Sequence, residues 1–461
     1  MAVDPSPREP SRHPAPGAPS RHGLTSRERQ DPIGYAVAFL NRLAKTTTLD
    51  RFGLRKPTER VVFEATRTGF RTLGAVNRQF ARTGRRSGTP TRVPAAAARG
   101  SFDLTPTEDE QMLVDVVSEF AAEVVRPAAS EADATATASE SVLKASLDIG
   151  LPILGVPEEL GGISTERSTM AGTLVAEALA HGDMGLAVAT LAPGAVSTAL
   201  SLWGDEQQQA TYLPAFTADD VPAAALALTE PRPLFDAFEL GTTAVRDGDD
   251  IVLTGVKSMV PRGADAELFV VGAMLDGEPR LVLLESDTDG LEIEAEPSMG
   301  LRAASLSRVV LDGVAVGEEA LLGSTEDYAD CVRLSRLAWC ALALGTGQAV
   351  LDYVVPYVNE REAFGEPISH RQSVAFMVAN IGIELQGMRL VTYRAASRAA
   401  QGKSFAREVA LARRLCAERG MQIGNDGVQL LGGHGYVKEH PVERWYRDLR
   451  AIGLMEGGVL V

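Results

Sequence analysis

The chain has 461 residues, 45% of them hydrophobic and 23% charged, and a formal net charge of −16. This length and composition can bury a large core and predict about three domains. No run reaches the roughly 18 uninterrupted apolar residues of a membrane span, so an integral membrane protein is not expected.

The cysteines and histidines do not suggest a disulfide-linked or metal-binding protein. Cys331, Cys340 and Cys416 fall in helix-like sequence without paired spacing, which argues against a disulfide framework or a zinc site. The six histidines include no pair at metal-ligand spacing, since turn residues separate His434 from His440. The pattern fits a reducing, cytoplasmic setting and predicts no bound metal.

The first 101 residues are predicted to be a basic extension on an acidic body. Residues 1–100 hold 19 Lys and Arg against 7 Asp and Glu, a net charge of +12, and the remainder carries −28. The first 30 residues are rich in Pro, Ser, Arg and Gly, which predicts disorder. A transit peptide is one interpretation, against which three acidic residues count: Asp4, Glu9 and Glu28.

Two helical patterns follow, at 32–47 and 57–82. In the second, arginines surround an apolar face, which is typical of a helix that lies on an anionic membrane surface or binds an acidic partner. The alternative is a helix that packs on the chain's own acidic body, and the charge asymmetry supports both interpretations. Nucleic acid is not an expected partner, because few aromatic residues are interleaved with the basic ones. Peripheral membrane contact through 32–82, and hence a membrane-associated location, is one hypothesis.

The remaining chain predicts an α+β fold that is mostly α. Residues 102–221 have helical periodicity, and the cap pattern at Thr105 to Glu108 predicts a helix that ends before Pro127. Residues 222–323 contain short apolar runs separated by turn residues, which predict a middle β-domain. Helical periodicity returns over 324–461. The short runs are Ala223 to Leu228, Thr242 to Val245, Ile251 to Leu253, Leu268 to Val271, Leu281 to Leu284 and Arg308 to Leu311.

One glutamate near the end of the chain is a candidate base. Glu456 follows the apolar Leu454 and Met455 and precedes two glycines, so its carboxylate is predicted to be partly buried beside a backbone that a ligand can approach. Burial raises the pKa of a carboxylate and makes it a better base near neutral pH. The alternative is an ordinary surface glutamate near the terminus. About 20 residues earlier, the stretch Gln429 to Tyr436 predicts a helix that stops in a glycine cluster, which suits a polyanionic ligand.

These two stretches together resemble the C-terminal signature of the acyl-CoA dehydrogenase family of flavoproteins. The resemblance extends over roughly 102–456 and implies an N-terminal helical domain, a middle β-domain and a C-terminal four-helix bundle, with FAD as cofactor. It implies that Glu456 removes the substrate's α-proton and that its backbone N–H polarises the thioester carbonyl. It also implies that Gln429, Gly432 and Gly433 contact the FAD diphosphate across a dimer interface.

Two further segments carry the resemblance. Arg361 and Phe364, with Gln372 eleven residues after the arginine, resemble a segment that reaches FAD bound mainly to a neighbouring subunit. A guanidinium suits a diphosphate because its donors match two oxygens, although a solvated helix-end arginine is the alternative. Near the expected base, Arg336 matches the family's arginine, so the resemblance assigns it to the substrate with Met455 and Gly457. Arg333 replaces the acidic neighbour usual in the family.

The third segment, with Leu228 and Thr229, resembles the strand end that holds the flavin edge, and here the chain departs from the family. At the expected cofactor-binding positions the departures each remove a polar or aromatic group. They are Phe235 for a serine, Met259 for a tryptophan, Pro261 for a threonine and Gly458 for a threonine.

The resemblance therefore implies FAD-dependent α,β-dehydrogenation of an acyl-CoA thioester, with electrons passed to an electron-transferring flavoprotein, by a homodimer or tetramer. The four departures support an alternative, a weakly catalytic or non-catalytic subunit of a hetero-oligomeric dehydrogenase, or an acyl-thioester binding protein. An oxygen-using flavin oxidase or monooxygenase on the same fold is a third interpretation, which the presence of Glu456 makes weaker.

Overall fold

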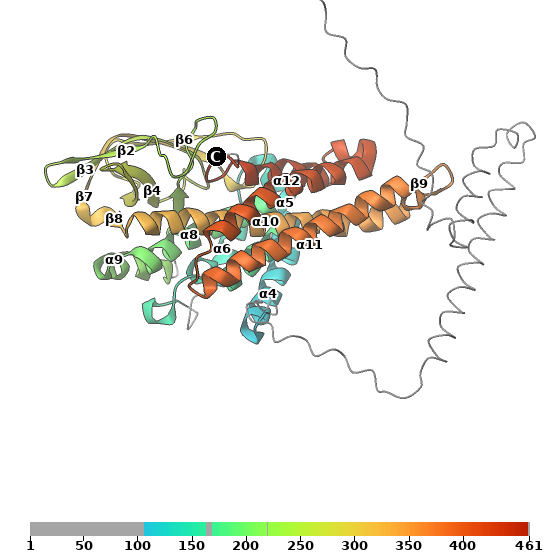
Figure 1. Cartoon of the computed structure of the whole chain (residues 1–461), viewed down its shortest axis with the longest axis horizontal. Helices are drawn as coiled ribbons and strands as arrows, with labels where there is room; N and C mark the ends of the chain where they lie inside the picture. Colours follow the sequence, from blue (N-terminus) through green and yellow to red (C-terminus); the bar gives the residue numbers. More distant parts are fainter. Residues whose placement is uncertain (1–105, 163–167, 219, 460–461) are drawn as a thin grey trace, which may run out of the picture. The chain divides into compact units, whose positions relative to one another are not determined.

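The computed structural model of the chain describes residues 106–162, 168–218 and 220–459 (Figure 1). All of these residues belong to one unit, Gly100–Val461. The basic extension, its two predicted amphipathic helices and the hypothetical membrane contact through 32–82 lie outside the described residues.

The N-terminal part is helical, as its periodicity predicts. Its helices are α4 (Glu108–Phe120), the π-helical segment η2 (Ala121–Val125), α5 (Arg126–Thr135), α6 (Glu140–Asp148), α7 (Thr169–Gly182), α8 (Met184–Trp203) and α9 (Glu206–Phe216).

The first helix begins and ends differently from the sequence prediction. The N-cap is Thr107, two residues later than expected, because Thr107 and Glu110 form the reciprocal hydrogen bonds of a capping box. The helix also continues past Pro127. The π turn lets Arg126 N–H donate to the Ala121 carbonyl, and this wider turn accommodates a proline, which has no N–H to donate. The predicted break before Pro127 was therefore wrong.

The middle part is an eight-stranded sheet in the order β6-β7-β3-β2-β4-β5-β8, with β1 paired to β4 in parallel. Most neighbouring strands are antiparallel, and β4 is buried along almost its whole length. The strands are β1 (Ala224–Ala227), β2 (Thr243–Asp247), β3 (Asp250–Val260), β4 (Leu268–Leu275), β5 (Glu278–Glu285), β6 (Leu291–Ala295), β7 (Ser307–Gly317) and β8 (Leu321–Leu322).

The C-terminal part consists of long helices that run beside one another (Figure 1). They are α10 (Thr325–Glu360), α11 (Gln372–Ala400) and α12 (Ala406–Leu431), followed by the 3₁₀ segment η8 (Gly432–Tyr436), α13 (Val442–Asp448) and η9 (Leu449–Gly453). The short ribbon of β9 (Glu362–Ala363) and β10 (Glu366–Pro367) joins α10 to α11 at the end farthest from the sheet.

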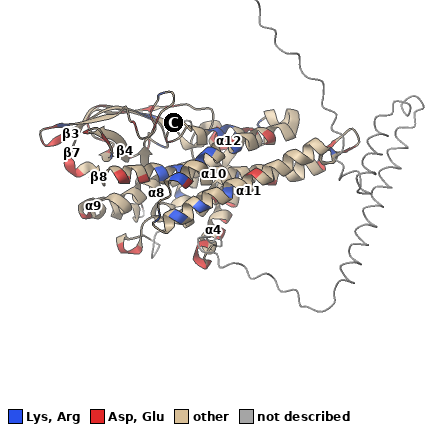
Figure 2. Ribbon diagram, viewed as in Figure 1, with Lys and Arg blue, Asp and Glu red and all other residues tan. Residues whose placement is uncertain are grey.

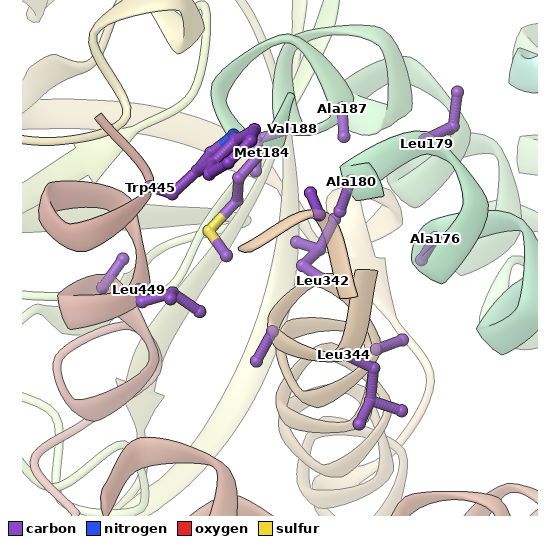
Figure 3. Close-up of a cluster of buried hydrophobic side chains, with 14 of the residues drawn as sticks. Ala176, Leu179, Ala180, Met184, Ala187, Val188, Leu342, Leu344, Trp445 and Leu449 are labelled. Atoms are coloured by element: carbon purple, nitrogen blue, oxygen red, sulfur yellow. The ribbon is translucent and has the colours of Figure 1, made fainter. Parts of the chain in front are cut away.

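The largest core joins the N-terminal and C-terminal helices. Figure 3 shows residues of α7, α8, α10, α13 and η9 meeting in this core, with Trp445 beside Met184. Small residues let the helices approach closely: a Cβ on Gly345 of α10 would lie 1.9 Å from the Glu177 carbonyl oxygen of α7. This contact holds α10, which carries much of the candidate site, in a fixed position against α7.

Three helices, α8, α10 and α11, are long and apolar enough to cross a membrane by length and composition. In the most apolar 18-residue windows of α8 and α10, 67% is buried inside the chain, so the protein core accounts for much of their apolar character. The corresponding window of α11 is only 17% buried. Figure 2 shows basic residues on neighbouring stretches of α10, α11 and α12.

Candidate functional site

Glu456 lies at the centre of the candidate site and is only 6% exposed. Its Oε1 accepts a hydrogen bond of 2.9 Å from the Ser335 hydroxyl of α10. Its Oε2 is buried and has no hydrogen-bond partner among the described residues. Buried polar atoms are usually satisfied, so this free oxygen is an acceptor available to a ligand. The expectation of a surface glutamate does not apply.

The surroundings of Glu456 affect its pKa in opposite directions. Burial raises the pKa above its ordinary value, while the Ser335 hydroxyl and the Arg413 and Arg336 guanidiniums act against that rise. The result is a raised pKa, because the cost of removing the charge from water is the largest contribution. The carboxylate is therefore a stronger base than an exposed glutamate.

Two arginines hold the backbone around the carboxylate. Arg336 donates from Nε and Nη2 to the Glu456 carbonyl, at 3.0 and 2.7 Å. Arg413 of α12 donates from Nη2 to the Met455 carbonyl at 2.8 Å and to the Gly457 carbonyl. Glu456 has a φ of +52°, a left-handed conformation that is uncommon for a residue with a side chain. These four hydrogen bonds to three successive carbonyls stabilise this conformation and fix the direction of the side chain.

The sheet approaches Glu456 through the end of β1. The Glu456 N–H donates to Thr229 Oγ1 at 3.1 Å, so the group expected to polarise a thioester carbonyl already has an acceptor. Behind it, Lys257 is fully buried and pairs with Glu230 at 2.9 Å. The Lys257 ammonium also donates to the Leu228 carbonyl, which ties the strand end in place.

The positions that depart from the family lie along the same edge. The Ser258 N–H donates to the Thr229 carbonyl, and Glu296 accepts from the Met259 N–H at 2.6 Å. Met259 has a φ of +54° and packs against the core, and Pro261 follows the end of β3. At the other two positions, the Gly458 N–H donates to the Phe235 carbonyl at 2.7 Å. The last residues of the chain are thereby attached to the loop after β1.

The expected cofactor residues near Glu456 form a first group: Leu228, Thr229, Met259, Pro261 and Gly458. The other expected cofactor residues form a second group at the far end of α10. Tyr357 of α10 lies beside the glycine segment, since its hydroxyl is 3.4 Å from His434 Nδ1. At a rise of 1.5 Å per residue, Tyr357 lies about 32 Å along the helix from Arg336. The structure therefore does not bring the expected cofactor residues together within one chain. The second group comprises Gln429, Gly432 and Gly433 at the end of α12, and Arg361, Phe364 and Gln372 at the α10–α11 turn.

An apolar cavity of about 220 Å³ opens beside the first group. It lies between α7, α8 and α10, and Ser335, the hydrogen-bond donor to Glu456, lines it together with Leu226 of β1. An apolar ligand could therefore lie next to the buried base. The cavity and the base together are suited to removing a proton from carbon in a mostly apolar substrate.

The residues present fit the expected FAD, with fewer side-chain donors than the family pattern. Near the base, the Thr229 hydroxyl accepts one bond and keeps its own hydrogen for a ligand. At the second group, a Cβ on Gly432 or Gly433 would meet no atom within 4 Å, so the backbone there is open to a diphosphate. Phe235 and Pro261 supply no side-chain hydrogen bond.

Two functional residues were not predicted from the sequence. Ser335 precedes the predicted Arg336, and its hydroxyl could have been suspected only from that neighbour. Arg413 lies 43 residues before Glu456 in an ordinary helical pattern, so no local signal marks it. Only the fold brings α12 next to the C-terminal segment.

Three family models match the chain. They are the acyl-CoA dehydrogenase N-terminal domain over residues 107–220, the middle domain over 225–314 and the C-terminal domain over 329–458. The short/branched chain specific acyl-CoA dehydrogenase of Rattus norvegicus, a mitochondrial protein, is 30% identical over 364 residues, which cover 77% of this chain and 83% of the relative.

Solved structures are similar over the same region. Butyryl-CoA dehydrogenase from Megasphaera elsdenii has a TM-score of 0.72 and 26% identity, covering 78% of this chain and 97% of that chain. A chain from a structure described as "Electron transferring flavoprotein of Acidaminococcus fermentans" has a TM-score of 0.72 and 29% identity, with the same coverage. The predicted order of helical, β and helical parts is confirmed.

Proposed function

The chain belongs to the acyl-CoA dehydrogenase family, whose members are FAD-dependent oxidoreductases, and from this premise we propose that it oxidises the α,β bond of an acyl-CoA thioester with Glu456 as the base. The observation that carries the proposal is the buried Glu456 carboxylate, whose Oε2 is unpaired among the described residues and whose Oε1 accepts from Ser335, a residue that lines an apolar cavity. Such an oxygen is suited to take a proton from the carbon next to a thioester carbonyl.

The residues around Glu456 have separate tasks in this reaction. FAD, when bound, supplies the acceptor for the β-hydride, since no side chain accepts hydride reversibly. The Glu456 carboxylate takes the α-proton, and the electron pair left behind forms the new double bond as the β-hydride departs. Two nearby cations, Arg336 and Arg413, stabilise negative charge that develops on the thioester oxygen. For the Glu456 N–H to polarise that oxygen, it must exchange Thr229 Oγ1 for the substrate.

The site is proposed to be completed by a second copy of the chain. Because the two groups of cofactor residues are separated by about 32 Å along α10, one FAD would contact the first group of one copy and the second group of another. The exposed face of α11 supports such contact, since large apolar residues recur there at seven-residue spacing: Phe376, Ile383 and Leu390.

We expect light scattering to show a homodimer or tetramer. Ile383→Glu should dissociate it, because the substitution places a charge on the exposed apolar face of α11.

Electrons are proposed to pass to an electron-transferring flavoprotein in a reducing, cytoplasmic location. This chain is similar to a chain in a structure whose description names an electron-transferring flavoprotein, and that similarity supports such a protein as the electron acceptor. The three cysteines are free and buried, which is consistent with a reducing environment.

A weakly catalytic subunit is the second candidate function, because specific contacts favour it. Phe235 provides no hydroxyl, and the Glu456 N–H already donates to Thr229. Each lost hydrogen bond to a cofactor lowers its affinity by about 1 kcal/mol. In this case the purified protein would be colourless and would co-purify with a second homologous chain.

The visible absorption spectrum of the purified protein distinguishes the two functions. A flavin spectrum that bleaches anaerobically on addition of acyl-CoA supports the dehydrogenase. Flavin that is present but remains oxidised with every acyl-CoA from butyryl to palmitoyl contradicts it. Rapid peroxide formation on turnover in air would instead favour an oxidase.

Ser335 is expected to influence the pH dependence of the reaction. Its hydroxyl stabilises the ionised form of Glu456, so Ser335→Ala should raise the Glu456 pKa further. The acidic limb of kcat/KM should then move to higher pH by roughly one pH unit. Ser335→Thr, which keeps the hydroxyl, is the control. An unchanged acidic limb in Ser335→Ala would show that the hydroxyl does not control the base.

A further inference from the structure

The apolar cavity beside Glu456 is lined by three helices whose facing residues are small. Its walls come from α7, α8 and α10, with η3 (Leu151–Ile153) and its following loop at one side. Three of the lining residues, Ala176, Ala195 and Ala338, have side chains too small to fill the space between the helices. The cavity is therefore a consequence of residue size rather than of helix separation alone.

The glycines of the cavity fall into two kinds. A Cβ on Gly155 would lie 2.0 Å from Thr198 Oγ1, and one on Gly194 would lie 2.9 Å from the Leu151 carbonyl oxygen, so close packing requires both glycines. A Cβ on Gly172 of α7 would meet nothing within 4 Å. Glycine destabilises a helix relative to alanine, so packing gives no reason for this residue. Gly172 is exposed, so the space in front of it is open to solvent and available to a ligand.

The volume of the cavity limits the ligand. An apolar cavity of about 150 Å³ holds one benzene, which has six carbon atoms, so a cavity of 220 Å³ holds about nine. A four-carbon acyl group would fill about half of this space. Apolar space that remains empty loses its contacts, so a longer acyl group should bind more tightly.

A second cavity marks where this apolar space ends. It has a volume of about 280 Å³ and shares three lining residues with the first: Thr169, Leu334 and Trp203. Its other walls carry charged side chains, among them Arg333, which bonds to Glu326 and Asp330 at 2.7 Å. An alkyl chain that continued into it would take these charges out of water, which is unfavourable.

We infer that the preferred substrate carries an acyl group of about eight carbons, whose tail fills the cavity between α7, α8 and α10. The inference rests on the proposed function, since it takes the acyl thioester as the ligand. Each methylene that enters the cavity should tighten binding about threefold. Octanoyl-CoA should then bind on the order of 50- to 100-fold more tightly than butyryl-CoA, and palmitoyl-CoA should gain nothing beyond octanoyl-CoA.

Calorimetry on the flavin-loaded Glu456→Gln protein tests this, because the variant lacks the base and binding is measured without turnover. Butyryl-, octanoyl- and palmitoyl-CoA are compared in this variant. The comparison is then repeated with Gly172→Leu on α7 or Ala338→Leu on α10 added, since both residues line the cavity. Each leucine should reduce the preference for octanoyl-CoA over butyryl-CoA at least tenfold. Gly172→Ala is the control and should change the preference less than threefold.

The outcomes separate this inference from the proposed function. If butyryl-CoA binds as tightly as octanoyl-CoA before any leucine is added, the inference is overturned while the dehydrogenase proposal stands. An unchanged preference in leucine variants that still bind butyryl-CoA also overturns it. If no acyl-CoA binds and none bleaches the wild-type flavin, the proposed function itself fails. If both leucine variants lose all binding, the comparison of the three acyl-CoA esters on the Glu456→Gln protein without a leucine substitution decides whether the inference holds.

Discussion

Glu456→Gln is expected to lower kcat for acyl-CoA oxidation by about 10²- to 10⁴-fold, the range that a positioned general base contributes. Glutamine keeps the size of the side chain and can still accept the Ser335 hydrogen bond. It cannot take the α-proton. Because neither Arg336 nor Arg413 contacts the side chain through a hydrogen bond, both should continue to hold the backbone carbonyls.

The measurement is the anaerobic rate of flavin bleaching by acyl-CoA, together with the flavin content of the variant. We expect full flavin content with slow bleaching. Glu292→Gln, on the exposed edge strand β6, is the matched control and should bleach at the wild-type rate. A Glu456→Gln protein that bleaches within threefold of wild type would assign the base elsewhere.

The strands that the sequence predicted correctly are the continuous apolar runs. All six runs coincide with strands, from β1 to β7, because each has enough apolar residues to be buried on at least one face. Two strands of the sheet were missed. One, β8, has only two residues, and the other, β6, alternates Leu-Glu-Ile-Glu and has no buried residue. Its alternation was the available signal, since an edge strand with one solvated face shows period two rather than an apolar run.

The candidate site was predictable only where its residues are close in sequence. The prediction that Glu456 is partly buried follows from its apolar and glycine neighbours, and the structure confirms the burial. The partners that fix it come from distant elements: Ser335 is 121 residues away and Thr229 is 227 residues away. Local periodicity contains no information about such contacts. The Thr229 acceptor on the Glu456 N–H was likewise not foreseen, because it depends on how β1 meets the C-terminal segment.

The attachment of that segment depends on a buried ion pair, and its loss is the largest stability effect we expect. Asp183 begins α8, where Oδ1 accepts from the Leu186 N–H at 3.0 Å, and its Oδ2 accepts from Arg444 Nε of α13 at 2.8 Å. Asp183 is 1% exposed. The Arg444 side chain is 11% exposed, so both charges are largely removed from water. Breaking such a pair costs about 3–5 kcal/mol, because the remaining charge is buried and loses its hydrogen-bonded partner.

Asp183→Ala should therefore destabilise the protein by about 3–5 kcal/mol, measured by urea denaturation of the flavin-free protein. Arg444 would be left beside Arg126, whose pKa burial already lowers and which Arg444 further disfavours in its charged form. The effect should also reach the site, because α13 and η9 lead directly into Met455 and Glu456. We expect weaker flavin retention in the variant as a result.

Asp205→Ala is the matched control, since Asp205 also begins a helix and accepts from the Gln208 N–H at 2.7 Å, but pairs with no arginine in the part of the chain that the structure describes. Losing this exposed cap should cost only about 1 kcal/mol. Asp183→Asn, which keeps the cap acceptor and removes the charge, should fall between the two. If Asp183→Ala costs no more than Asp205→Ala, the pair with Arg444 adds no net stability, and the helix contacts around Trp445 alone must hold α13 against α8.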